Sequence, residues 1–230
     1  MQSMQTQRQY NHRSGTAQQV LSGHNGVRRN VPSRHASRSS ARPVAAYRLR
    51  GQSDTSTPFC APETWHEPTE SGELNYIVQD AGKGYWHPVT VEEIQQRIDL
   101  LPSRFIADLE VVQLSRMTKK RSFFPYYGMQ WGVSVFLYPI EDSLTESYAR
   151  PPTPAQLIEA RMYGGQWEQK GRKWTLRWTE STIKDFYLNN VLIHEIGHLN
   201  DLRNTKVEAR EQFANWFAIE HGYRTSRGRK

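Results

Sequence analysis

Residues 182–202 read TIKDFYLNNVLIHEIGHLNDL, a stretch in which apolar residues recur at helical spacing. Within it, His194, Glu195 and His198 form an H-E-x-x-H pattern. Four residues advance an α-helix by slightly more than one turn, so both imidazoles project from the same face and can bind one ion. The stretch therefore predicts a helix that carries two metal ligands.

The residue types around this pattern favour zinc. The chain has a single cysteine, Cys60, which excludes multi-cysteine zinc and iron–sulfur sites, so the ligands must come from His, Asp or Glu. Glu195 stands beside the first histidine, where it can act as general base on a zinc-bound water, as in peptide-bond hydrolysis. A pattern of three fixed positions also arises by chance, and the histidines would then be ordinary surface residues. Its position between apolar flanks in mid-helix favours the metal site.

A third ligand is expected shortly after the pattern. Glu211, one turn inside the next predicted helix, is the preferred candidate, and Glu208 and Asp201 are the alternatives. Asp201 and Asn204 occupy the positions where a metzincin would have Gly and His, which argues against that subclass. Asp201 could instead orient a ligand imidazole, or be an ordinary acid near a helix end.

Small residues indicate that the two helices pack closely. Gly197 lies inside the first helix, where its expected role is to let a neighbouring element approach. Ala214 and Ala218 follow Glu211 on the second helix at helical spacing. An ion shared by the two helices requires such a close approach. A hydrogen-bond donor that stabilises the transition state would be a Tyr, His or Arg side chain near the scissile carbonyl. The available candidates are Tyr163, Tyr126, Tyr127 and His221.

The H-E-x-x-H pattern, followed by Glu-x-x-Ala-Asn-x-Phe-Ala at 211–218, resembles the gluzincin branch of zinc metallopeptidases, particularly the small ImmA/IrrE-type proteins. The resemblance covers about residues 182–222. It implies a zincin-like fold in which an edge strand receives the substrate peptide, for which residues 133–137 are the candidate. It also implies a zinc site and a catalytic base made by His194, His198, Glu211 and Glu195.

The remaining pattern predicts an α+β domain, a small mixed sheet packed with helices, in the order β-α-β-β-α-β-α-α. Strands are expected over 74–79, 108–114, 132–138 and 173–178, and helices over 90–102, 153–164, 182–202 and 205–222. Capping boxes are expected at Thr90, Thr182 and Thr205, and Thr153 is expected as an N-cap with Pro154 at the first helical position. Residues 119–131, basic and aromatic, are expected to form a loop, either a hairpin with aromatics in the core or a surface for single-stranded nucleic acid.

The charge is concentrated at one end of the chain. The 230 residues carry a net charge of +7, but residues 1–58 hold nine arginines against one acid, a net charge of +8. We expect this segment to be a disordered Arg-rich tail, residues 59–72 a linker, and residues 73–230 the zincin-like domain. The tail is either an arm for nucleic acid or another anionic partner, or a solvated extension. No secretory signal or apolar run of membrane-spanning length is visible, so a cytoplasmic location is expected.

Together these features predict a zinc-dependent endopeptidase that acts on an intracellular protein or peptide substrate. One alternative is a regulatory or nucleic-acid-binding protein on a zincin scaffold with little or no hydrolytic activity. Another is a purely structural metal site that joins the last two helices. Glu195 favours catalysis, since a structural site needs ligands but no base.

Overall fold

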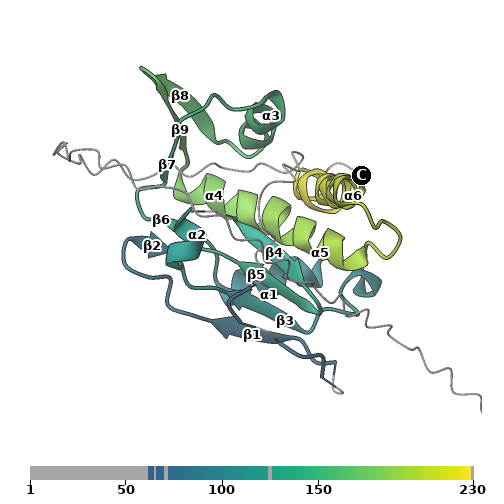
Figure 1. Cartoon of the computed structure of the whole chain (residues 1–230). Coiled ribbons are helices and arrows are strands. Elements are labelled where there is room, and N and C mark those ends of the chain that lie inside the picture. Colours follow the sequence, from purple (N-terminus) through teal and green to yellow (C-terminus); the bar gives the residue numbers. More distant parts are fainter. Residues whose placement is uncertain (1–61, 65, 70–71, 124–125, 229–230) are drawn as a thin grey trace, which may run out of the picture. The chain divides into compact units, whose positions relative to one another are not determined.

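The computed structural model describes residues 62–64, 66–69, 72–123 and 126–228 (Figure 1). The chain divides into two units, residues 1–40 and 41–230, and every described residue belongs to the second. The Arg-rich tail, Cys60 and part of the predicted linker lie outside the described residues.

A four-stranded mixed sheet forms one layer of the fold. Its strand order is β1 (Asn75–Val78), β3 (Val111–Leu114), β5 (Ser134–Leu137) and β4 (Gly128–Trp131). The first three are parallel, and β4 runs antiparallel to β5, with Gly128 opposite Leu137. The prediction that residues 133–137 form the edge is wrong, because β4, which lies in the predicted loop, pairs with β5 and becomes the edge strand itself.

Both faces of this sheet are covered, and every residue of β3 and β5 is buried. Alternate side chains of neighbouring strands share a face. Val112, Leu114, Val135 and Leu137 enter the main core, where Ile94 and Ile98 of α1 (Val91–Asp99) join them. Buried parallel strands of this kind read as continuous apolar runs, which is why the sequence pattern identified them.

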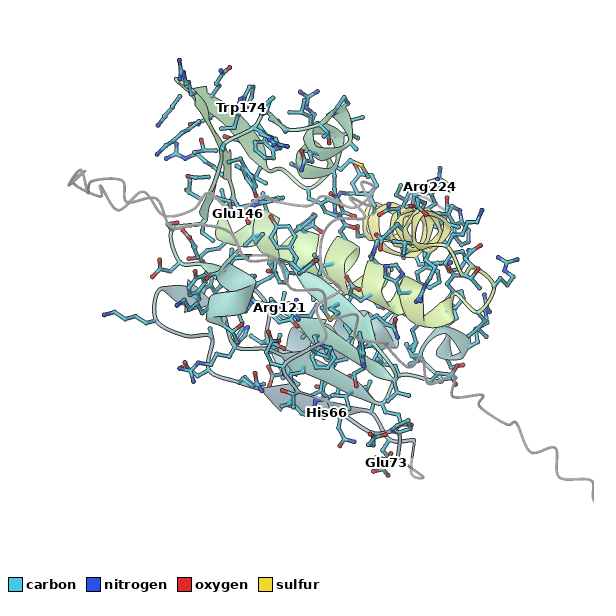
Figure 2. All side chains as sticks on the ribbon, in the orientation of Figure 1. His66, Glu73, Arg121, Glu146, Trp174 and Arg224 are labelled. Atoms are coloured by element: carbon cyan, nitrogen blue, oxygen red, sulfur yellow. The ribbon has the colours of Figure 1, made fainter. Side chains whose placement is uncertain are left out.

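An extended segment contacts the second face of the sheet. His66 Nε2 lies 2.8 Å from Gln113 Oε1, and the His66 ring stacks on Phe136. Glu63 accepts a hydrogen bond of 3.0 Å from Nε of Arg121, whose side chain is only 1% exposed. Figure 2 labels His66 and Arg121, both below the long helix in that view. Glu63 and His66, which belong to the segment expected to be a linker, therefore pack on the domain.

Two smaller antiparallel sheets complete the β structure. β2 (Tyr85–Trp86) pairs with β6 (Ile140–Glu141), and the other sheet has the order β7 (Thr145–Tyr148), β9 (Lys173–Arg177) and β8 (Gln166–Lys170). Of these, only β9 was predicted. α3 (Pro154–Met162) contacts β8, and it begins as predicted, with Thr153 as N-cap and proline at the first position. The short helices η1 (Ser103–Phe105) and α2 (Lys119–Phe123) were not expected.

The strongest helical pattern forms one continuous helix. It comprises α4 (Glu180–Phe186), a π-helical turn η2 (Tyr187–Val191) and α5 (Leu192–Asn200). Its capping residue is Thr179, which accepts from the Thr182 amide, so the capping box expected at Thr182 is wrong by three residues. The cap expected at Thr90 is confirmed, with a reciprocal bond to Glu93.

The last helix begins later than predicted. α6 (Val207–Ala218) continues into the π-helical η3 (Ile219–Arg224). Its N-cap is Lys206, which makes no side-chain capping bond, so the capping box expected at Thr205 is wrong. The α+β class is confirmed. None of the helices in the described part of the chain combines the length and the apolar character that a membrane span requires.

Candidate metal centre

The helix α5 carries the H-E-x-x-H pattern and is fixed by its apolar face. Leu192, Ile193 and Ile196 are completely buried in the main core. α5 contacts β4 and β5 on one side and α6 on another, and Figure 1 shows α6 alongside it. Because these apolar side chains fix the rotation of the helix, the opposite positions, including both histidines, are directed toward α6 and the sheet edge.

The two imidazoles face each other. The Nε2 atoms of His194 and His198 lie 2.9 Å apart, and the ring planes are nearly perpendicular. His194 is only 1% exposed, and His198 is partly buried. The buried Nδ1 of His198 has no hydrogen-bond partner among the described residues. Both Nε2 atoms therefore point to one position, as the spacing of four residues predicted.

Glu211 of α6 reaches the same position. Its Oε1 lies 3.2 Å from Nε2 of His198, and its Oε2 lies 3.5 Å from Nε2 of His194. Burial raises the pKa of Glu211, but the hydrogen bonds to the two imidazoles outweigh that effect and hold its pKa well below the usual range. The carboxylate is thus ionised and aimed at the two nitrogens. Two imidazole nitrogens and a carboxylate are a donor set that suits zinc.

Small residues bring α6 close enough for this contact. A Cβ added to Gly197 would lie 3.0 Å from Cβ of Phe217 and 3.1 Å from the backbone of Ala214. Ala214 and Ala218 are both buried. The expectation that Gly197 and these alanines permit close packing of the two helices is confirmed.

Glu195 lies beside the two histidines. It is 5% exposed, and its potential ligand atom and those of His194 and His198 all lie within 4.8 Å of one another. On its other side is Gly128 of β4, where an added Cβ would come within 2.9 Å of Cγ and Oε1 of Glu195. The carboxylate therefore occupies the space between the histidines and the edge strand.

The alternative third ligands have other surroundings. Asp201 accepts hydrogen bonds from the backbone and side-chain nitrogens of Asn204, at 3.1 Å and 3.0 Å, and so closes the loop after α5. Glu208 is exposed in the first turn of α6. Glu211 is the candidate whose carboxylate lies within 3.5 Å of Nε2 of both histidines.

Three of the four candidate hydrogen-bond donors for the transition state have other partners. The Tyr163 hydroxyl donates to the backbone oxygen of Asn189, and the Tyr127 hydroxyl donates to Glu146. His221 packs against Phe105 and Phe217.

Gly128 is the neighbour of the site that sequence reasoning missed. It lies in β4, within a stretch expected to be a loop, so it was not considered as part of a strand. A glycine inside a strand often marks a close approach by another element, but that signal is of use only after the strand itself has been identified.

Comparison with known proteins does not identify a family for this chain. No family model, no curated protein and no solved structure matches this chain. The functional argument therefore depends on the residues of the site and their geometry.

Proposed function

We propose that this protein is a zinc-dependent endopeptidase that hydrolyses peptide bonds of an intracellular protein substrate. The observation that carries the proposal is the convergence of His194, His198 and Glu211 on one position with Glu195 beside it. His194, His198 and Glu211 would hold the metal. Three protein ligands leave a coordination position open, which is typical of catalytic zinc sites.

Bound zinc would polarise the substrate carbonyl and lower the pKa of a bound water. Glu195 takes the proton of the attacking water as the oxygen bonds to the carbonyl carbon. It then gives that proton to the amide nitrogen as the C–N bond breaks, so the products are a carboxylic acid and an amine. The burial of Glu195 between α5 and β4 supports this role, because a fixed carboxylate needs little reorganisation during proton transfer.

The edge strand β4 is the surface on which we propose that the peptide lies. Among the described strands only β5 pairs with it, so its other side offers backbone groups to an extended chain. Gly128 of this strand contacts Glu195, which would bring a peptide bound along β4 next to the base. An active-site helix behind a mixed sheet with an antiparallel edge strand is also what the zincin-like fold would require, and this supports our assignment of that fold.

The test uses the full-length protein, loaded with one equivalent of zinc and incubated with a random peptide library whose fragments are read by mass spectrometry. We expect new peptide termini with the wild type and none with Glu195→Gln, which should keep the metal. Glu208→Gln, the same change at an exposed acid of α6, is the matched control and should cleave like the wild type. Absence of cleavage by the zinc-loaded wild type, or equal cleavage by Glu195→Gln, would refute the proposal and leave a regulatory or structural site.

A further inference from the structure

We infer that Gly128 is a positioning residue for Glu195: the bare backbone of β4 at this position fixes where the carboxylate stands relative to the two histidines. This inference rests on the proposed function, in which Glu195 is the general base. It adds a residue from a different element to the machinery, outside the H-E-x-x-H helix.

The contact between strand and carboxylate leaves no room for a side chain. A Cβ on Gly128 would lie 2.8 Å from Cγ1 of Val191, 2.9 Å from Cγ of Glu195 and 2.9 Å from Oε1 of Glu195. Carbon atoms in normal contact are about 3.5–4.0 Å apart. Even the smallest side chain, a methyl group, therefore requires both Val191 and Glu195, or the strand itself, to shift.

The strand is held and cannot retreat easily. The backbone oxygen of Tyr127, just before Gly128, accepts a hydrogen bond of 2.9 Å from the Tyr138 amide. The Tyr127 hydroxyl donates to Glu146 at 2.6 Å, and its ring packs edge-on against Phe186. Gly128 itself is paired in register with Leu137 of β5. The start of β4 is thus tied to the neighbouring strand, to β7 and to the long helix.

The helix on the other side is equally fixed. Val191 is completely buried and precedes α5, and the apolar residues of α5 fill the main core. The Glu195 side chain, with three rotatable bonds, is the partner that can move at the lowest cost. A methyl group at position 128 should therefore displace the Glu195 carboxylate while the histidines and Glu211 keep their places.

Gly197, inside α5, and Gly128, in the neighbouring strand β4, should affect different properties of the site. Gly197 sets the distance to α6, which carries Glu211, whereas Gly128 sets the distance to β4 and touches the base. A change at Gly197 should disturb metal binding. A change at Gly128 should disturb proton transfer and leave the metal bound.

The experiment compares Gly128→Ala with the wild type and with Gly171→Ala in full-length protein. Gly171 is a matched control because an added Cβ there meets nothing within 4 Å, although its φ of +61° makes the change mildly strained. We expect Gly128→Ala to bind one equivalent of zinc like the wild type, and its crystal structure to show a displaced Glu195 carboxylate. Its kcat on a library-derived peptide should fall roughly 100-fold, the scale of an ångström-sized misplacement, with KM little changed.

A second substitution tests the steric origin of the effect. Val191→Ala removes the closest of the three contacts and should give the added methyl group room beside Glu195, so the double variant should recover part of kcat. An unmoved Glu195 in the crystal structure of Gly128→Ala, or an undiminished kcat, would overturn the inference. Loss of zinc from Gly128→Ala would overturn it as well. A wild type that cleaves nothing would instead refute the proposed function, and the position of Glu195 in the variant structure would still decide whether Gly128 positions it.

Discussion

The Nε2 atoms of His194 and His198 lie 2.9 Å apart, and each of them faces one oxygen of the same carboxylate, that of Glu211. Two donors from one helix and a third from the next thus meet at one position. Such an arrangement concentrates polar groups between two helices that also pack through Gly197, Ala214 and Phe217. The free-energy cost of burying these polar groups is offset only if they form hydrogen bonds with one another or coordinate a bound ion.

Glu211→Gln in the metal-free protein is predicted to change the pH dependence of stability. The hydrogen bonds to the two imidazoles lower the pKa of Glu211 below its unfolded value of 4.5, so its stabilisation is present above pH 4.5 and is lost as the pH falls further. We expect the variant to be less stable at pH 7 by on the order of 1–3 kcal/mol. The difference should shrink on acidification. Denaturant unfolding with chelator from pH 7 to pH 3.5 measures it, and a difference that grows toward acid would contradict this account.

Glu146→Gln is predicted to act with the opposite sign. Burial raises the pKa of Glu146 to about 7, although the hydrogen bonds from Tyr127 and Trp178 lower it. Because the folded pKa exceeds the unfolded one, the folded protein holds this proton more tightly, and stability is lost as the pH rises from about 4.5 through 7. The glutamine side chain keeps an oxygen that can accept from Tyr127 and Trp178. At pH 8 the variant should therefore be more stable than the wild type, by on the order of 1–3 kcal/mol.

The control for Glu146 is the same change at the exposed Glu67. Denaturant unfolding at pH 5 and pH 8 compares the three proteins. If Glu146→Gln is destabilising at pH 8 while Glu67→Gln is neutral, the carboxyl of Glu146 is stabilising in its charged form and the predicted sign is wrong.

Gly197→Ala is predicted to weaken zinc binding. The added methyl would lie 3.0 Å from Phe217 and 3.1 Å from the backbone of Ala214, and would push α6 away from α5. Alanine gains up to about 1 kcal/mol in helix propensity, but overpacking of this kind costs about 1–3 kcal/mol. Zinc affinity, measured by competition with a chelating dye, should fall by at least 10-fold, the low end of the 10- to 100-fold loss seen on removing an outer-shell partner. Unchanged affinity would mean that α6 does not depend on this contact.

Glu63→Ala is predicted to destabilise the domain through the segment at residues 63–69. Arg121 is 1% exposed, and the substitution removes a carboxylate that bonds its Nε. We expect a loss of about 1–2 kcal/mol in the free energy of unfolding. Glu67→Ala, an exposed change in the same segment, should be nearly neutral. Equal effects of the two substitutions would show that the ion pair with Arg121 contributes nothing specific.

The parts of the fold that sequence predicted are those with strong local signals. The capping residues Thr90 and Thr153, the buried strands β3 and β5, and the long helix that bears the histidines all follow from periodicity and capping chemistry. Glu211 was identified as the preferred third ligand from its place on the next helix, and the structure brings it to both imidazoles.

The strands that the sequence did not reveal lack an alternating apolar pattern and depend on their partner strands. β4 is short, basic and aromatic residues precede it, and it becomes a strand because β5 offers it a partner. β7 pairs with β9 across residues 149–172, whereas β8 pairs with β9 across a two-residue turn at residues 171–172. Gly128 could be recognised as a neighbour of Glu195 only once β4 was known to lie beside α5.

The most direct test of the central claim is the zinc content of the purified full-length protein, measured by mass spectrometry of the metal after removal of any affinity tag. The account predicts one zinc per chain in the wild type and in Glu195→Gln. It predicts loss of most of that zinc in His194→Ala and in Glu211→Ala, but not in Glu208→Ala. A wild type without zinc after incubation with an excess of the ion, or a Glu211→Ala variant that keeps a full equivalent, would contradict it.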